Sequence, residues 1–443
     1  MPNDPRQRDW NLCQDVGVPK SAPIDPAALS RRGLLVTASL AAAGLAASRS
    51  ALAGVTFAPE GHVAATQNVL VVVFLRGGAD GLSVAPPYFE DAYHRARPNL
   101  RLGAPSDKAF SDAERAIRLD DRFGLHPALA PIGEIFRQGK AAVVQAVGSF
   151  DTTRSHFEAM SAMERGLAND GEGPSDGWLA RHLSSTARPS ETPLRAVSFG
   201  TTMPDSLRGA LNAISLSSIS DYRLRVDEDM RARLERELAK MYGTGKDAAS
   251  HAGNETLKVL QAVRGIDLKT KPKAEYPETG LGNGLRETAR LIHGKVGLEV
   301  ACLDMGGWDT HVTQGTGIGW MPTLLTEVGN AVGAFVKDLG PAIDRTTIVV
   351  MSEFGRRVAE NQALGTDHGR AGALFVLGGG VRGGKVYTDW PGLTREILDG
   401  PGDLPVTTDY RAVLAEILAA RLGAKDMTAV FPGFNGKPLG ITM

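Results

Sequence analysis

Short motifs that combine aspartate and histidine are the first candidates for chemistry in this sequence. Asp309 and His311 stand two residues apart, so in an extended loop both side chains point to one side and can bind one metal ion. Asp367 and His368 are adjacent, so their side chains diverge and could serve two ions, or act as a ligand and its supporting partner. A hydrogen-bonded turn is the alternative for each pair taken alone. Together, the two pairs indicate a metal site built from carboxylate and imidazole groups.

Two single carboxylates follow apolar runs of the sequence. Asp80 comes after the run Asn68 to Leu75, and Glu353 comes after the run Thr346 to Met351. Ligands of open α/β sheets bind at the carboxyl ends of the strands, so both residues are candidate metal ligands, although Glu353 could instead pair with a neighbouring arginine. Asp, Glu and His ligands without cysteine suit zinc, manganese or iron and disfavour a structural zinc finger. The expected cofactor is therefore a divalent metal ion.

A third candidate segment is Arg154-Ser155-His156. Ser155 precedes a predicted helix from His156 to Arg165, and the free N–H groups of a helix N-terminus attract anions. We expect this helix start to receive an anionic ester, Arg154 to pair with the oxygens of that ester, and His156 to move a proton. Ser155 and Glu158 also match a capping box, so a helix cap is the alternative for Ser155, and the two roles are compatible.

Apolar, β-branched runs alternate with helical patterns along the chain. The predicted strands are Asn68 to Leu75, Ala141 to Val147, Leu194 to Phe199, Val296 to Leu303, Thr346 to Met351 and Ala373 to Leu377. The predicted helices are Pro127 to Gln138, His156 to Arg165, Arg223 to Lys240, Gly284 to His293, Pro322 to Leu339 and Asp409 to Leu422. This alternation predicts an α/β fold with a mostly parallel sheet and helices on both faces. The polar motifs would then converge at one edge of the sheet.

The segment from Lys240 to Pro277 interrupts this alternation. Its apolar pattern weakens among Gly, Ser, Lys and Asn residues, which favours a cap or a long surface excursion over a domain boundary. We therefore expect residues 54–443 to form a single domain.

The first 53 residues resemble an export signal. Arg31 and Arg32 precede a short Ala- and Gly-rich apolar run, and Ala51-Leu52-Ala53 matches an A-x-A cleavage site. The arginine pair resembles a bacterial twin-arginine signal. The run is too short and too weakly apolar for a stable membrane anchor. We expect the twin-arginine machinery to be a partner and the mature protein to be periplasmic or secreted.

Composition excludes other classes. The formal net charge is −1, and 42% of the residues are hydrophobic, so the sequence predicts a globular chain without the basic surface that nucleic-acid binding requires. Cys13 and Cys302 are the two cysteines, and one lies in the predicted leader, so we expect no disulfide framework.

Five motifs together resemble the domain of unknown function 1501 family. These motifs are Phe74-Leu75-Arg76-Gly77-Gly78-Ala79-Asp80-Gly81, Ser155-His156-Phe157, Gly307-Trp308-Asp309-Thr310-His311, Ser352-Glu353-Phe354-Gly355-Arg356 and Gly365-Thr366-Asp367-His368-Gly369. The family is grouped with the alkaline phosphatase and sulfatase superfamily. The resemblance implies a three-layer α/β/α sandwich with one or two metals. It also implies ligand roles for Asp309, His311 and His368, a nucleophile near Ser155, and a site carboxylate at Asp80.

The leading hypothesis is an exported metal-dependent hydrolase of a phosphate or sulfate ester, either a small molecule or carried by a polymer. The alternative is a non-catalytic exported binding or assembly protein that retains an alkaline phosphatase-like fold. Three departures from the superfamily pattern motivate the alternative. Asp309 and His311 are closer together than the usual Asp-x-x-x-His, Glu353 has no adjacent histidine, and the Cys/Ser-x-Pro-x-Arg signature of sulfatases is missing.

Overall fold

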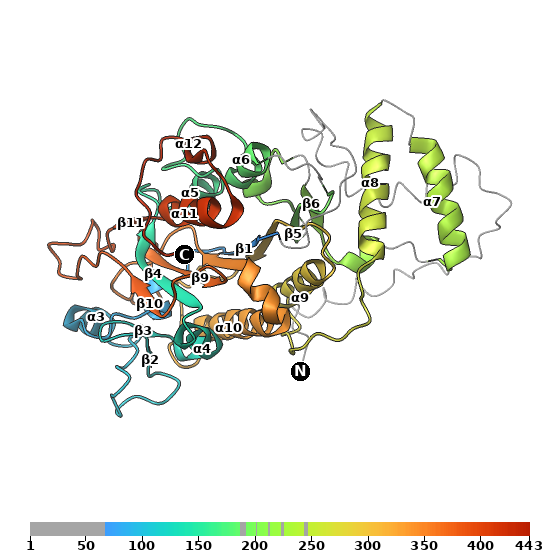
Figure 1. Ribbon diagram of the computed structural model, residues 1–443. Helices are drawn as coiled ribbons and strands as arrows, with labels where there is room; N and C mark the ends of the chain where they lie inside the picture. Colours follow the sequence, from blue (N-terminus) through green and yellow to red (C-terminus); the bar gives the residue numbers. More distant parts are fainter. Residues whose placement is uncertain (1–66, 187–191, 201, 211–212, 223–225, 243–246) are drawn as a thin grey trace, which may run out of the picture. The chain divides into compact units, whose positions relative to one another are not determined.

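The computed structural model describes residues 67–443, apart from 187–191, 201, 211–212, 223–225 and 243–246 (Figure 1). The predicted export signal therefore lies outside the described residues. Within the described part of the chain, no helix combines the length and apolar character that crossing a membrane requires.

A large mixed sheet forms the centre of the structure. Its strands are β1 Val69–Leu75, β4 Ala141–Gly148, β5 Ala196–Phe199, β6 Ala213–Leu216, β7 Val300–Met305, β8 Thr346–Met351, β9 Gly372–Gly378, β10 Lys385–Tyr387 and β11 Thr408–Asp409. Their order is β10-β4-β9-β8-β1-β7-β5-β6, and β11 also pairs with β4. All pairs are parallel except those made by β9. The predicted mostly parallel sheet is thus confirmed, with one antiparallel strand.

Helices make up most of the remaining structure. They are α2 Gly81–Val84, α3 Asp91–Ala96, α4 Ala130–Arg137, α5 His156–Glu164, α6 Trp178–Ser185, α7 Glu228–Tyr242, α8 Ala248–Arg264, α9 Gly280–His293, α10 Trp320–Leu339, α11 Tyr410–Leu422 and α12 Met427–Val430. Short 3₁₀ helices include η3 Pro127–Leu129, η4 Asp205–Leu207, η5 Ile219–Tyr222 and η6 Gly340–Arg345. A small separate hairpin pairs β2 Ile117–Arg118 with β3 Gly124–Leu125.

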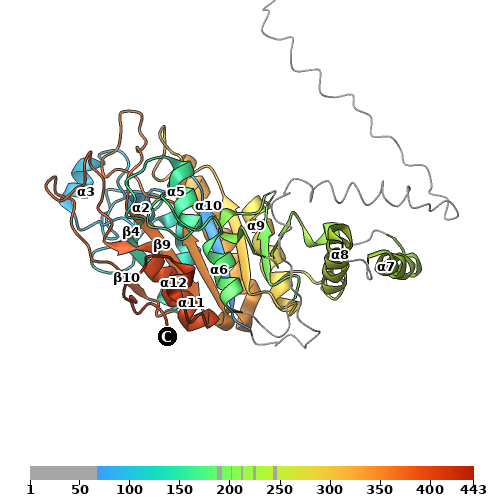
Figure 2. The ribbon, with the colours of Figure 1, turned by 90° about the horizontal axis from the view of Figure 1, so that it is seen from above.

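Helices cover both faces of the sheet. Alternate residues of β1 point to opposite faces, as the two-residue period of a strand requires. Val71 and Val73 join a core with α4, α9 and α10, whereas Leu70 and Val72 join a core with α6, α11 and α12. Figure 1 shows these two helix layers on either side of the strands, and Figure 2 shows α5, α6, α11 and α12 from above. The fold is therefore mixed α/β with helices on both faces.

The weakly patterned segment after Lys240 contains a helix that the sequence did not predict. Asp247 accepts a hydrogen bond from the N–H of Ser250 and so caps α8. Val259 and Val263 of α8 are buried in the core that also includes α9. Polar residues conceal this helix in the sequence because only a narrow stripe of it is apolar.

The register of the central strands brings four loops to one edge. Leu75 pairs with Met305, and Phe74 pairs with Met351, so β1, β7 and β8 end at the same level. Because β9 is antiparallel to β4 and β8, the residues that precede β9 reach this edge as well. We call it the carboxyl edge of the sheet.

Candidate metal centre

Three imidazoles and one carboxylate converge at the carboxyl edge. The Nε2 atom of His368 lies 3.0 Å from Nε2 of His156 and 2.9 Å from Nε2 of His311. Oδ1 of Asp309 lies 3.0 Å from Nε2 of His368, 3.0 Å from Nε2 of His311 and 3.4 Å from Nε2 of His156. We call these four residues the ligand cluster.

The second ring nitrogen of each histidine faces a hydrogen-bond acceptor. Nδ1 of His156 lies 2.7 Å from Oε1 of Glu353, and Nδ1 of His311 lies 3.3 Å from Oδ1 of Asp367. Nδ1 of His368 lies 2.8 Å from the backbone carbonyl oxygen of Arg154. These acceptors place the proton of a neutral imidazole on Nδ1, which leaves the lone pair on Nε2. Nε2 of His156 and of His368 and a carboxylate oxygen of Asp309 thus form a group that could hold one cation, and Nε2 of His311 lies beside His368 and Asp309.

Each member of the cluster comes from a different part of the carboxyl edge. His156 begins α5 after the loop that leaves β4, and Asp309 and His311 lie in the loop after β7. His368 lies four residues before β9 and pairs in a short bridge with Arg356, which follows β8. The antiparallel direction of β9 is what brings His368 to the other three residues.

Arg356 ties these loops together. Its side chain is buried, and its guanidinium donates a hydrogen bond of 2.7 Å to Oδ1 of Asp309. The guanidinium also donates to the backbone carbonyl oxygens of Gly77, Gly78, Trp308 and Thr366. One arginine thus joins the loops after β1, β7 and β8 to the loop before β9. We did not predict this role, although a conspicuous arginine follows Glu353 in the sequence.

Close backbone packing explains the glycines of the site motifs. Gly77 has a φ of +123°, and a Cβ there would lie 2.7 Å from the backbone nitrogen of Asp309. A Cβ on Gly365 would lie 2.2 Å from the carbonyl oxygen of His311. Any side chain at these two positions would push the loops of the cluster apart. Gly365, in the same motif as Asp367 and His368, therefore allows two backbone segments to approach closely.

Electrostatic interactions favour an ionised aspartate among neutral or partly charged imidazoles. Partial burial opposes ionisation of Asp309, but the hydrogen bond and the positive charge of Arg356 prevail and hold its pKa well below the usual range. Burial lowers the pKa of His368, which favours the neutral form that binds metals. The hydrogen bond to Glu353 raises the pKa of His156. Protons would therefore compete with a cation more strongly at His156 than at His368.

The structure places the six predicted metal ligands in three different positions. Asp309, His311 and His368 contribute atoms to the cluster. Glu353 and Asp367 lie one shell farther out, because their oxygens face the Nδ1 atoms of histidines rather than the common point. Glu353 also accepts a hydrogen bond from the backbone N–H of Gly77.

Asp80, the sixth predicted ligand, has its carboxylate engaged elsewhere. Both its oxygens receive hydrogen bonds from the buried guanidinium of Arg97, and Ser83 and Gln314 donate further ones. Burial opposes ionisation, but the charge of Arg97 keeps the pKa of Asp80 below its usual value. The carboxylate also caps α2 through the N–H of Leu82. Asp80 thus holds the loop after β1 in place rather than facing the cluster.

The three predicted catalytic residues also have defined positions. Nε2 of His156 belongs to the ligand cluster, whereas we predicted a proton-transfer role. Ser155 is the N-cap of α5, and its hydroxyl accepts a hydrogen bond of 3.5 Å from the N–H of Glu158. The guanidinium of Arg154 pairs with the buried Asp403, and its carbonyl oxygen orients His368. The cap expected as the alternative for Ser155 is therefore present.

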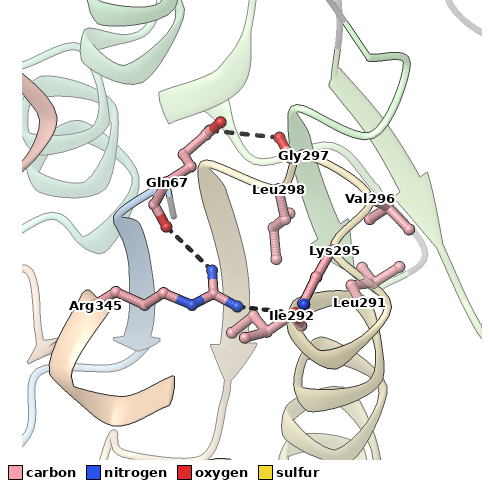
Figure 3. Close-up of a pocket in the computed structure, with 8 residues that line it drawn as sticks. All are labelled: Gln67, Leu291, Ile292, Lys295, Val296, Gly297, Leu298 and Arg345. Atoms are coloured by element: carbon pink, nitrogen blue, oxygen red, sulfur yellow. Dashed lines mark hydrogen bonds between the residues drawn. The ribbon is translucent and has the colours of Figure 1, made fainter. Parts of the chain in front are cut away.

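A small pocket at the amino ends of the strands lies away from this centre (Figure 3). The side chain of Arg345 donates to the carbonyl oxygens of Gln67 and Ile292 at 3.1 and 3.0 Å, respectively. Gln67 precedes β1 and Arg345 precedes β8, so the pocket lies at the opposite edge of the sheet. Arg345 thus uses its guanidinium to connect the segments before β1 and β8 with the end of α9, which is a structural role.

The described residues thus define a mixed α/β protein with a histidine–aspartate cluster at the carboxyl edge of its sheet. The chain belongs to a family described as a protein of unknown function (DUF1501), whose family model matches residues 67–443. No curated protein matches the chain.

Proposed function

We propose that this chain is a metal-dependent hydrolase of phosphate or sulfate esters with an alkaline phosphatase-like fold. The observation that carries the proposal is the convergence of three Nδ1-protonated imidazoles and Asp309 on one place. Without a cation, three lone pairs and a carboxylate oxygen would repel one another at these separations. The ester class comes from the family resemblance, which the charge of the site supports.

The donor set and its spacing fit a divalent transition metal. Ligand atoms about 2.1 Å from one ion lie roughly 3.0–3.4 Å apart, and the separations among the ligand atoms of His156, Asp309 and His368 are 3.0–3.4 Å. Nε2 of His311 lies 2.9 Å from Nε2 of His368 and 3.0 Å from Oδ1 of Asp309. Three imidazoles favour zinc, manganese or iron over magnesium or calcium, which prefer oxygen ligands. When bound, such an ion polarises the ester and lowers the pKa of water.

The residues around the cluster would keep the donors in place. Glu353, Asp367 and the carbonyl group of Arg154 fix the orientations of the three imidazoles, and Arg356 fixes Asp309. Arg356 pairs with Asp309 and Arg357 pairs with Asp367, and Glu353 beside His156 is a third carboxylate near the site. A divalent ion would change the net charge of these arginines and carboxylates from slightly negative to positive. A positive site suits an anionic substrate.

Metal analysis tests the ligand assignment. We expect protein purified from its native host to carry a divalent transition metal, and Asp309→Ala and His311→Ala to lose most of it. His94→Ala is the matched control, because His94 lies in α3 and its Nε2 faces the carbonyl oxygen of Tyr88. Unchanged metal content in both cluster variants would refute the assignment.

Turnover tests the reaction. Aryl phosphate and sulfate esters should be hydrolysed by the metal-loaded protein, and a chelator should abolish this activity until metal is returned. Metal retention without turnover of either ester class would favour the alternative, a non-catalytic binding or assembly protein. Export through the twin-arginine route remains part of the proposal on the evidence of Arg31, Arg32 and the A-x-A site.

A further inference from the structure

Exposed apolar side chains gather in the loops around the ligand cluster. Isolated exposed hydrophobic residues are ordinary on protein surfaces, whereas grouped ones mark binding sites. Six exposed large apolar side chains lie on the segments that supply the cluster or beside them, namely Phe150, Phe157, Val312, Ile318, Trp320 and Leu364. Phe157 and Val312 directly follow the ligands His156 and His311 in the sequence. The carboxyl edge therefore presents an apolar border around a polar centre.

Trp320 is the most firmly held member of this border. Its indole Nε1–H donates a hydrogen bond of 2.7 Å to the carbonyl oxygen of Gly307, two residues before Asp309. Its ring lies against the backbone, since a Cβ on Gly307 would be 3.7 Å from the ring. Trp320 is nevertheless 59% exposed. An aromatic ring is thus fixed beside the ligand loop, and part of its surface remains free.

The cluster is most exposed to solvent at Asp309 and His311. The side chains of Asp309 and His311 are 48% and 39% exposed, whereas those of His156 and His368 are each 19% exposed. Backbone hydrogen bonds from Thr313 to Ala363 and from Gln314 to Leu364 hold the two loops next to His311 together. The exposed members Asp309 and His311 therefore lie on segments that are hydrogen-bonded to those carrying Trp320 and Leu364, and Val312 directly follows His311.

We propose that this site selects anionic esters whose organic part is aromatic, with Trp320 as the stacking platform and Val312 and Leu364 as apolar walls. The inference rests on the proposed function for the anionic group. The polar N–H of Trp320 is already used within the protein, so the ring offers only an apolar face to a ligand. Its fixed position next to Asp309 suits a group covalently joined to the anion held at the cluster, rather than a distant surface.

Binding of non-hydrolysable analogues tests the inference without requiring turnover. We would titrate the metal-loaded protein with benzylphosphonate and ethylphosphonate by calorimetry. Stacking on an aromatic ring predicts that benzylphosphonate binds about tenfold more tightly. Trp320→Ala should remove this preference while leaving ethylphosphonate binding unchanged. Phe89→Ala is the control, because Phe89 is an exposed aromatic residue that packs on Phe123 away from the cluster.

Kinetics separate this inference from the proposed hydrolase function. Benzyl and ethyl phosphate release alcohols of similar acidity, so a difference in KM reports the organic group rather than the leaving group. A preference for benzylphosphonate without hydrolysis would overturn the hydrolase function and support the aromatic platform. Hydrolysis with equal KM values, or equal binding of both phosphonates, would overturn the platform. Concentration-dependent self-association that Trp320→Ala abolishes would also overturn it, because the apolar border would then be a contact between copies of this chain.

Discussion

Each histidine of the ligand cluster depends on a partner behind it. The shortest of these contacts joins Nδ1 of His156 to Oε1 of Glu353, at 2.7 Å, and the Glu353 side chain is fully buried. Such outer carboxylates fix the tautomer and orientation of a metal-binding imidazole and increase its basicity. The proposed metal site would therefore depend on Glu353, which lies behind the ligand His156.

Replacing the charge of Glu353 should weaken metal binding without removing a ligand. We expect Glu353→Gln to lower the affinity for zinc about 10- to 100-fold, because the amide still accepts the Nδ1 proton of His156 but carries no charge. Competition with a chromogenic chelator measures this change. An affinity equal to that of the unmodified protein would show that Glu353 does not support His156.

Asp80 provides the contrasting case among the predicted ligands. Asp80→Asn should leave metal affinity unchanged and lower the free energy of unfolding by about 3–5 kcal/mol, because it leaves the buried charge of Arg97 without its partner. Thermal unfolding and metal analysis of the same sample distinguish the two effects. A loss of metal at full stability would instead make Asp80 a ligand.

Residue types alone could predict most members of the site. They could not predict which members belong to the ligand cluster and which lie behind a histidine. Asp309, His311 and His368 are recognisable from their motifs, whereas Glu353 and Asp367 differ from ligands only by the few ångströms that separate Nδ1 from Nε2 of an imidazole. One physical signal was available, because three metal-binding histidines need three acceptors. Some of the nearby carboxylates would therefore accept hydrogen bonds from Nδ1–H groups of histidines instead of binding the ion.

At the scale of elements, helix α5 carries His156 in its first residue. Ser155 caps α5, and Thr153 donates a hydrogen bond to the carboxylate of Glu158. The start of this helix thus fixes the backbone of His156, and Glu353 orients its ring.

Loss of the cap should affect stability more than metal binding. We expect Ser155→Ala to lower the free energy of unfolding by about 1 kcal/mol, to retain the metal, and to keep most of any hydrolytic activity, because the hydroxyl oxygen faces the N–H of Glu158. Ser155→Asp, which can also cap a helix, should restore the stability. A complete loss of turnover in Ser155→Ala with metal retained would instead identify Ser155 as the nucleophile.

The sequence predicts the positions of the long central strands, but it does not predict the antiparallel direction of β9. Continuous apolar runs such as Thr346 to Met351 identify buried strands reliably because both faces of the sheet are covered. The reversed direction of β9 follows from the connection before it. Residues 352–371 contain no helix, and a parallel crossover normally requires one. Strand β7 begins at Val300 rather than at Val296, since Gly297 has a φ of +85°, which is incompatible with a regular strand.

At the scale of the whole molecule, His126 couples stability to pH. Nδ1 of His126 accepts a hydrogen bond from the N–H of Ala128, and Nε2–H donates to the carbonyl oxygen of Thr316. Burial lowers the pKa of His126 to about 4, whereas an unfolded histidine titrates near 6.5. Between these values the unfolded chain binds a proton that the folded chain excludes.

Acid should therefore destabilise the protein through His126. The contribution of this residue is complete above about pH 6.5 and falls by roughly 1.4 kcal/mol per pH unit down to about pH 4. His126→Asn retains an N-cap acceptor but does not titrate. Denaturant unfolding of both proteins from pH 7 to 4 should give a shallower pH dependence for the variant. Parallel pH profiles would exclude His126 as the cause.

The antiparallel strand β9 also bears on the order of folding and metal binding. His156 and His368 are more than two hundred residues apart and meet only when β9 has inserted between β4 and β8. Contacts of such long range form late in folding, so an unfolded chain offers no preformed binding place for an ion. Metal loading should then occur wherever the chain folds, and each bound ion would add its binding free energy to the stability of the finished sheet.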